Sequence, residues 1–194
     1  MDISKLKSNK GNYVDDIALI TPKIFKDERG FFYESWNEDI FQKISKNTKF
    51  VQDNHSSSSS GVLRGLHYQL NPHAQGKLVR CTSGEIYDVA IDLRRNSKTY
   101  KEWIGIKLNE NNKLILWIPE GFAHGFLTLS RVAEVQYKTT KKWNKGSEIS
   151  LLWDDPIIDI NWPIDKLNKS KPTLSKKDKN ALNINKIEIL NYTF

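Results

Sequence analysis

In the middle of this chain, apolar residues alternate with polar ones in short runs, and each run ends in residues that favour turns. Residues 77–81 and residues 86–93 are two such runs, and the turn residues Thr82-Ser83-Gly84-Glu85 separate them. Alternation with period two places side chains on the two faces of a strand in turn, and a short turn between two strands is typical of a hairpin. The pattern predicts a β-hairpin over residues 77–93.

The same alternation recurs along most of the chain, which favours a sandwich or barrel of short strands, with a jelly roll among the options. Two segments look helical. Residues 38–44 place apolar side chains on one face, and residues 175–178 form a short turn capped by Ser175, with Asp178 at the third position. The serines at 56–60 are expected at a polar edge or loop. Further strands are predicted at 16–20, 31–35, 103–108, 114–118, 125–129, 133–139 and 149–153.

The 194 residues suffice for one domain with a tail but not for two separate cores. Cys81 is the only cysteine, which excludes an intramolecular disulfide and a zinc site built from cysteines, and favours a reducing compartment. The first ten residues hold no apolar stretch resembling a signal-peptide core, and no later apolar run approaches the length of a membrane span. We therefore expect a cytoplasmic protein with no membrane partner.

The formal net charge of +7 is concentrated near the C-terminus. Residues 166–179 contain six lysines and one acidic residue, Asp178, so little net charge remains for the rest of the chain. A solvated basic segment and a nucleic-acid surface are both compatible with this run. The aromatic residues lie within strand-like runs and form no stacking motif, so we expect no nucleic-acid partner.

Metal-binding jelly rolls generally present two histidines as His-x-His on one strand. Here the corresponding strand reads His67-Tyr68-Gln69, and glutamine is a poor metal ligand. No acidic residue follows at the usual spacing, so no metal site is predicted. His67 retains two interpretations: a histidine satisfied by its surroundings, or part of an anion-attracting cleft if Arg64 and Lys77 face inward with it.

A set of short motifs lies in a fixed order between residues 19 and 180. The motifs are Gly61-Val62-Leu63-Arg64-Gly65-Leu66-His67-Tyr68-Gln69 and residues 20–22, 27–34, 52–54, 75–80, 88–94, 118–126, 137–140 and 162–163. In order and spacing they resemble those of the dTDP-4-dehydrorhamnose 3,5-epimerases, the cupin family of the rhamnose pathway. This resemblance implies an all-β fold, a cupin-type jelly roll with a few short helices, over residues 16–165. Residues 1–15 are then an N-terminal extension, and residues 166–194 a basic C-terminal segment packed on the same domain.

The resemblance implies an enzyme that inverts C3 and C5 of a dTDP-4-keto-6-deoxyhexose, from dTDP-4-dehydro-6-deoxy-D-glucose to dTDP-4-dehydro-L-rhamnose. The ketone acidifies the neighbouring C–H bonds, and inversion needs a base, an acid on the opposite face, and stabilisation of the enolate oxygen. On the matching positions, His67 is the expected base, oriented by Asp178. Tyr137 is the expected acid, and Lys77 the cation near the C4 oxygen. This route needs no metal and no organic cofactor.

Taken singly, three of these four residues have ordinary structural interpretations. Asp178 would be a solvated charge in a lysine-rich stretch, Tyr137 would pack beside Val135, and Lys77 would be an exposed strand lysine. All four positions fall together in one family pattern, which favours the catalytic interpretation.

The resemblance further implies a nucleotide-sugar substrate and a homodimer that exchanges N-terminal strands. Cationic and aromatic groups are the usual partners of a diphosphate and a base. Arg29, Phe32 and Glu34 are expected at the nucleotide, partly across the dimer interface. The other expected substrate-binding residues are Gln52, Asn54 and Arg64 around the diphosphate and sugar, with Asp88, His124 and Trp143 along the cavity.

Trp143 departs from the family pattern, in which a second tyrosine commonly follows the catalytic one. The indole keeps an aromatic wall but loses the phenol. An epimerase acting at C3 or C5 only, or one acting on a different nucleotide-linked 4-keto sugar, therefore remains open, because such relatives share the scaffold. A nucleotide-sugar-binding cupin without turnover is a further alternative.

Overall fold

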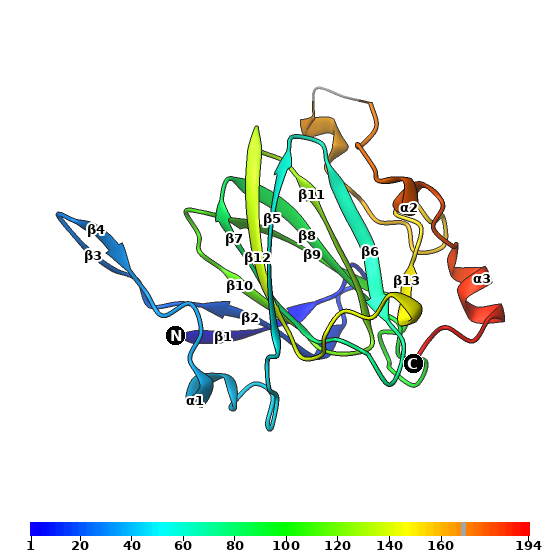
Figure 1. Ribbon diagram of the computed structural model, residues 1–194, viewed down its shortest axis with the longest axis horizontal. Helices are drawn as coiled ribbons and strands as arrows, with labels where there is room; N and C mark the ends of the chain where they lie inside the picture. Colours follow the sequence, from blue (N-terminus) through cyan, green and yellow to red (C-terminus); the bar gives the residue numbers. More distant parts are fainter. Residues whose placement is uncertain (168–169) are drawn as a thin grey trace.

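The computed structural model describes residues 1–167 and 170–194 and is built from two antiparallel sheets that face each other (Figure 1). This is the cupin-type jelly roll that the family resemblance implied, and one of the all-β folds that the strand pattern left open. One sheet contains β1 (Asp2–Lys7), β2 (Tyr13–Thr21), β10 (Ile115–Ile118), β7 (Lys77–Ser83), β12 (Val132–Thr139) and β5 (Gln52–Ser59), in that order. The other contains β13 (Glu148–Ser150), β6 (Leu63–Gln69), β11 (Phe122–Thr128), β8 (Glu85–Asp92) and β9 (Trp103–Asn109).

The space between the sheets holds one apolar core, to which both sheets contribute. Val79 and Leu116 come from the six-stranded sheet, and Ile86 and Leu108 from the five-stranded sheet, and all four are fully buried. Burial of this kind stabilises the fold by about 25 cal/mol for each Å² of apolar surface removed from water. Since alternate residues of each strand point inward, this core accounts for the period-two pattern of the sequence.

The predicted hairpin at residues 77–93 is wrong in its pairing. β7 pairs with β10 and β12, whereas β8 pairs with β9 and β11 in the other sheet. The chain crosses between the sheets at Gly84, which has φ +74°, a backbone angle that favours glycine. A Cβ atom at this position would lie 2.2 Å from the Val132 carbonyl oxygen, so the crossing also requires the small residue.

Residues 2–7 of the N-terminal extension form β1, the edge strand beside β2. The turn after β1 is held against the body of the domain by the buried Glu102 carboxylate, which accepts hydrogen bonds from Ser8 and Asn12. At the opposite edge of the same sheet lies β5, which includes the serines at 56–59, as expected for a polar edge.

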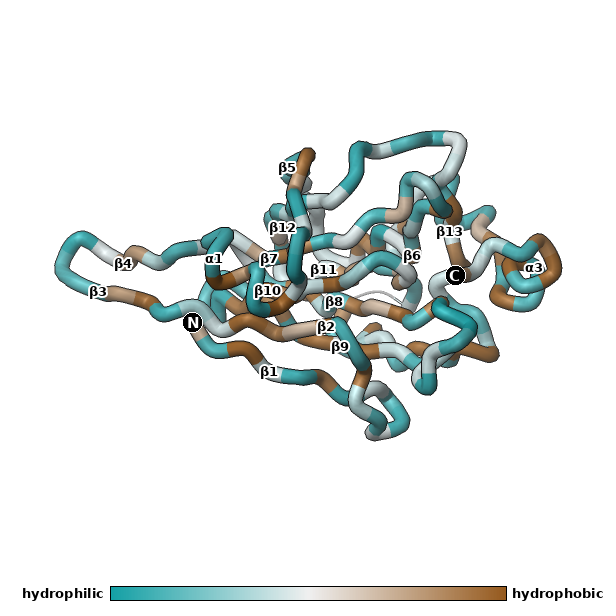
Figure 2. Tube along the Cα trace, turned by 90° about the horizontal axis from the view of Figure 1, so that it is seen from below, coloured by the Kyte–Doolittle hydropathy of each residue, from teal (hydrophilic) through white to brown (hydrophobic). Residues whose placement is uncertain are grey.

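A short two-stranded arm, β3 (Phe25–Asp27) and β4 (Gly30–Phe32), projects away from the two sheets (Figure 1). Figure 2 shows hydrophobic segments along this arm. Phe25, Phe31 and Phe32 are all more than half exposed, which is unusual for phenylalanine in a folded chain. After the arm, α1 (Glu38–Phe41) is capped by Asn37, whose side chain accepts the Ile40 N–H. The helix packs Phe41 against Trp117 on the outer face of the six-stranded sheet. This helix is shorter than the predicted segment 38–44.

The C-terminal segment covers the outer face of the five-stranded sheet (Figure 1). Its helices are α2 (Lys176–Lys179) and α3 (Ile184–Ile189), and α3 buries Ile184 and Ile187. Ser175 caps α2 by accepting the Asp178 N–H, as predicted, whereas α3 was not predicted. Two short 3-10 helices lie at Lys145–Ser147 and Ile164–Lys166. Of the six lysines at residues 166–179, Lys169 lies outside the described residues.

Within the described ranges, the longest apolar helix falls short of what is needed to cross a membrane.

Candidate active site

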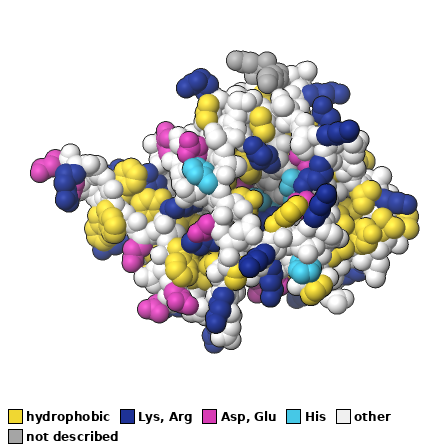
Figure 3. All heavy atoms as spheres, in the orientation of Figure 1, with side chains coloured by type: hydrophobic (Ala, Val, Ile, Leu, Met, Phe, Trp, Pro, Cys, Tyr) yellow, Lys and Arg dark blue, Asp and Glu magenta, His cyan; other side chains and the backbone are white. Residues whose placement is uncertain are grey.

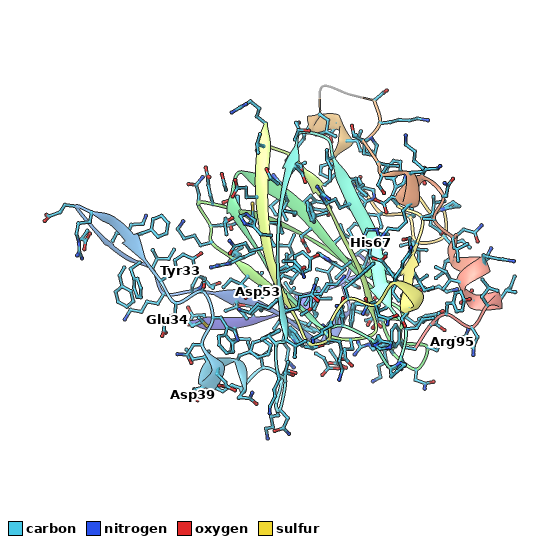
Figure 4. The ribbon with its side chains drawn as sticks, viewed as in Figure 1. Tyr33, Glu34, Asp39, Asp53, His67 and Arg95 are labelled. Carbon is cyan, nitrogen blue, oxygen red and sulfur yellow. The ribbon has the colours of Figure 1, made fainter. Side chains whose placement is uncertain are left out.

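Two cavities lie between the sheets, with volumes of about 510 Å³ and about 300 Å³. Three residues line both of them: His67 on β6, Lys77 on β7 and Tyr137 on β12. Figure 4 shows His67 in the body of the domain, far from the projecting arm. Figure 3 shows the surface of the molecule in the orientation of Figure 1, and on it Lys and Arg side chains lie near the visible histidine side chains. The three shared residues define one candidate site that extends in two directions.

His67 and Asp178 form a short hydrogen bond, with 2.6 Å between the imidazole Nε2 and the carboxylate Oδ1. They are 111 residues apart in sequence, and α2 places Asp178 over β6. Burial opposes ionisation of Asp178, but the hydrogen bonds from His67 and Ser175 and the charge of Lys177 lower the pKa of this carboxyl overall. The dyad therefore consists of an ionised carboxylate and an imidazole, with Nδ1 as the second ring nitrogen.

The pKa of His67 lies below its ordinary value of 6.5, because the ring is buried. The nearby cations Lys177 and Lys77 lower this pKa further, and Asp178 opposes them. Since the group titrates below neutral pH, His67 is uncharged near pH 7 and can accept a proton.

Lys77 is buried at the floor of the site and donates a hydrogen bond from Nζ to the His67 carbonyl oxygen, at 3.1 Å. Burial lowers the pKa of Lys77 to about 8, although Asp88 and Glu148 partly offset this effect. The amine is therefore mostly protonated at neutral pH and loses its proton just above it. A buried ammonium group is a strong electrostatic partner for a negative charge that forms nearby.

Tyr137 reaches the site from the sheet opposite His67. Burial raises the pKa of its phenol, while the positive charge of Arg64 acts in the other direction. The hydroxyl therefore keeps its proton at neutral pH and is available as a donor. The sequence left open whether Tyr137 packs in the core; in the structure it packs against the core between the sheets and also lines the cavities.

Five of the other residues expected at the substrate line one of the two cavities. Gln52, Asn54 and Trp143 line the smaller one, and the Gln52 amide bonds both the Asn54 side chain and the Trp143 backbone. Arg64 and His124 line the larger one.

Asp88 does not line either cavity, which corrects the expectation that it would. It is fully buried, and both carboxylate oxygens lie 3.0 Å from Nε2 of His124. The two residues lie diagonally across the β8–β11 pairing, in which Asp88 is opposite Phe126 and His124 is opposite Ala90, and alternation places both side chains on the inner face of the sheet. Asp88 thus supports His124 from behind the cavity wall.

Arg29, Phe32 and Glu34 lie on or beside the projecting arm, and none of them lines either cavity of this chain. The Arg29 side chain is 85% exposed and pairs with Asp27, and Phe32 is 68% exposed. Figure 4 shows Glu34 on the arm side of the molecule, where it accepts a hydrogen bond from Asn37.

Two charged residues that the sequence motifs did not indicate, Lys177 and Glu148, flank the dyad. Lys177 lines the larger cavity and Glu148 the smaller one, and the two form an ion pair of 3.0 Å. In the sequence, Lys177 is one lysine of the basic run at residues 166–179, and Glu148 belongs to none of the motifs quoted above. Gln69, considered above as a weak metal ligand, instead donates a hydrogen bond from its side-chain amide to the His73 carbonyl oxygen and accepts one from the Asn144 N–H. Among the described residues, no three or more His, Cys, Asp or Glu side chains come together as a metal site would require.

Comparison with known proteins agrees with this architecture. The family model for dTDP-4-dehydrorhamnose 3,5-epimerase matches residues 12–186. A dTDP-4-dehydrorhamnose 3,5-epimerase from Shigella flexneri is 52% identical over 169 residues, which are 87% of this chain and 91% of the relative.

Solved structures of similar proteins superpose on the whole domain. A dTDP-6-deoxy-D-glucose-3,5-epimerase from Legionella pneumophila, in complex with dTDP-4-keto-L-rhamnose, is 42% identical with a TM-score of 0.87 and covers 97% of this chain and 96% of its own. An epimerase from Mycobacterium tuberculosis is 31% identical with a TM-score of 0.93, and the match covers 100% of this chain and 93% of that epimerase. The chain belongs to the dTDP-4-dehydrorhamnose 3,5-epimerase family, an enzyme family of isomerases, as the motifs of its sequence predicted.

Proposed function

We propose that the protein inverts C3 and C5 of a dTDP-linked 4-keto-6-deoxyhexose by proton transfer through an enolate, with His67 as base and Tyr137 as acid. The observation that carries this proposal is that these two groups line the same cavities from opposite sheets, with Lys77 between them in sequence and shared by both cavities. A sugar ring bound there has a proton acceptor on one face and a proton donor on the other.

In the first step, neutral His67 takes the proton from a carbon next to the C4 ketone, and the electron pair of the C–H bond moves toward the ketone oxygen. The imidazolium that forms donates to Asp178, whose buried carboxylate stabilises the new positive charge and fixes the ring. Because Nε2 is held by Asp178, the other ring nitrogen is the one that faces the substrate in this scheme.

The enolate oxygen becomes negative only as the proton leaves, so a cation placed beside it stabilises the transition state more than the ground state. Lys77 is the buried cation of the site and supplies this stabilisation. Tyr137 then gives its proton to the carbon from the opposite face, which inverts the centre. The tyrosinate takes a proton from solvent and His67 releases one, so protons balance over the cycle.

The function is tested by incubating the protein with dTDP-4-keto-6-deoxyglucose in D2O and following the sugar by NMR. Deuterium at both C3 and C5 of an inverted product supports the proposal. Deuterium at one carbon selects the mono-epimerase alternative, which the indole of Trp143 on the cavity wall leaves open. Binding without any exchange, measured by calorimetry, would leave only a nucleotide-sugar-binding protein.

We also propose that the protein acts in the cytoplasm as a homodimer in which the arm of each copy completes the site of the other. Arg29, Phe32 and Glu34 lie away from the cavities of their own chain, and the exposed phenylalanines of the arm need a covering surface. Light scattering should give twice the chain mass of 22.5 kDa.

Subunit complementation tests the arm directly. His67→Ala and Arg29→Ala are each expected to be impaired, but a heterodimer of the two has one site with both residues intact. Mixing equal amounts after dissociation should restore about a quarter of the wild-type activity. No recovery in a mixed dimer would place Arg29 in the site of its own chain and contradict the exchange.

A further inference from the structure

Lys177 and Glu148 form an ion pair beside the His67–Asp178 dyad, with Nζ and Oε1 3.0 Å apart. Lys177 directly precedes Asp178 on α2, and Glu148 lies on β13, the edge strand that pairs with β6. In that pairing Ser150 lies opposite His67 and Glu148 opposite Gln69. The pair therefore joins the helix that carries Asp178 to the strand beside the base.

The position of the pair matters more than its contribution to stability. The Lys177 and Glu148 side chains are 46% and 18% exposed, and ion pairs this accessible contribute little to the stability of a fold. Backbone hydrogen bonds already fix the segment on both sides of α2, through Leu63 with Thr173 and through Leu182 with Ser150. A purely structural tie is thus unnecessary here.

The charge of Lys177 acts on both His67 and Lys77, whereas that of Glu148 acts on Lys77 and Tyr137. The positive charge of Lys177 lowers the pKa of His67 and of Lys77, and the negative charge of Glu148 raises the pKa of Lys77. The groups that face His67 from the surrounding elements are Asp178 and Lys177 on α2, Lys77 on β7, Tyr137 on β12, Arg64 on β6, His124 on β11 and Glu148 on β13. Of these, Lys177 and Glu148 are paired with each other and have no role in the proton transfers.

We propose that Lys177 and Glu148 are positioning residues that set the pH range of the site, the lysine by favouring the neutral base and the glutamate by limiting that effect and preserving the ammonium of Lys77. This inference rests on the proposed function for its consequence in catalysis, but the electrostatic coupling itself does not. Removing either partner breaks the same ion pair, yet the two removals leave opposite charges beside His67.

The test is an NMR titration of the His67 imidazole in the full-length protein without substrate, in Lys177→Met and Glu148→Gln variants. Lys177→Met should raise the pKa of His67, and Glu148→Gln should lower it. Lys179→Met removes a positive charge from the same helix at an exposed position and should leave the pKa of His67 unchanged. A shift in the same direction for both partners, or no shift in either, would overturn the inference.

With substrate, the pH profile of kcat/KM should follow the titration. In Lys177→Met, His67 and Lys77 both become more basic, so the whole profile moves to higher pH, and activity on its acid side falls about threefold. In Glu148→Gln the profile moves to lower pH. A structural tie would lower activity in both variants without these opposite shifts. Because the NMR titration needs no turnover, absence of epimerase activity would overturn the proposed function and leave this inference standing.

Discussion

His67 and Tyr137 lie on opposite sheets of the jelly roll and line the same two cavities. Strand β6 carries the imidazole and strand β12 the phenol, and these strands do not pair with each other. The fold thus places the proposed base and the proposed acid on opposite walls of these cavities. Inversion of a carbon centre requires this kind of opposition, because a single group can only return a proton to the face from which it came.

Replacing the base should remove turnover and spare binding. His67→Ala deletes the proton acceptor but leaves Lys77, Arg64 and the cavity walls in place, so kcat should fall by about 10²–10⁴-fold. Calorimetry with the nucleotide sugar should show affinity close to that of the wild type. A variant that keeps a near-normal kcat would show that another group is the base.

Asp178→Asn tests the partner of the base at nearly constant shape. The amide cannot stabilise the imidazolium, so kcat should fall by about 100-fold or more. Asp178 holds the pKa of His67 up, and the acid limb of the pH profile should therefore move to lower pH in this variant. If the acid limb of the pH profile stays where it is in the wild type, ionisation of His67 is not what causes that limb. Asp165→Asn, at an exposed position outside the cavities, is the matched control.

The pH dependence of the wild type should be bell-shaped. On the acid side, His67 must lose its proton to act, and its pKa lies below 6.5. On the basic side, Lys77 must keep its proton, and its pKa is about 8. Activity should therefore decline above about pH 8. In Lys77→Arg the side chain keeps its charge at high pH, so the decline in activity above about pH 8 should disappear, whatever the overall rate of the variant. If the decline persists, deprotonation of Lys77 is not its cause.

The sequence pattern predicted most strands of the two sheets but not their pairing, and the strand predicted at 31–35 ends at Phe32. Alternation shows which residues form strands and which side chains point inward, but it carries no information on the partner of each strand. Residues 77–93 show this limit, because the tight turn at Gly84 is typical of a hairpin and in fact joins two sheets. Only the stacking of both sheets around one core decides that a short turn becomes a crossing.

The site could be predicted only through the resemblance to a family. Composition indicates a solvated charge at Asp178, since lysines surround it, and no local rule connects it to a histidine 111 residues away. The Ser175 cap was predictable because it is local. The burial of Asp88 behind His124 and the pairing of Lys177 with Glu148 depend on tertiary contacts, and neither leaves a trace in spacing.

The crossing at Gly84 can be tested by stability. Gly84→Ala places a Cβ against the Val132 carbonyl at a backbone angle that disfavours alanine, so the free energy of unfolding should fall by about 2–4 kcal/mol. Gly11 also has positive φ but nothing lies within 4 Å of a Cβ built there. Gly11→Ala should therefore cost only about 1–2 kcal/mol. Equal losses in urea denaturation would show that the close approach at Gly84 is unimportant.

The most direct test of opposed proton transfer is the behaviour of Tyr137→Phe in D2O. This variant keeps the base and lacks the acid, so His67 can remove a proton, exchange it with solvent and return deuterium to the same face. NMR of the recovered sugar should show deuterium next to the ketone with the starting configuration retained and no epimer formed. Formation of the inverted sugar at an appreciable rate would contradict the assignment of Tyr137 as the acid on the opposite face.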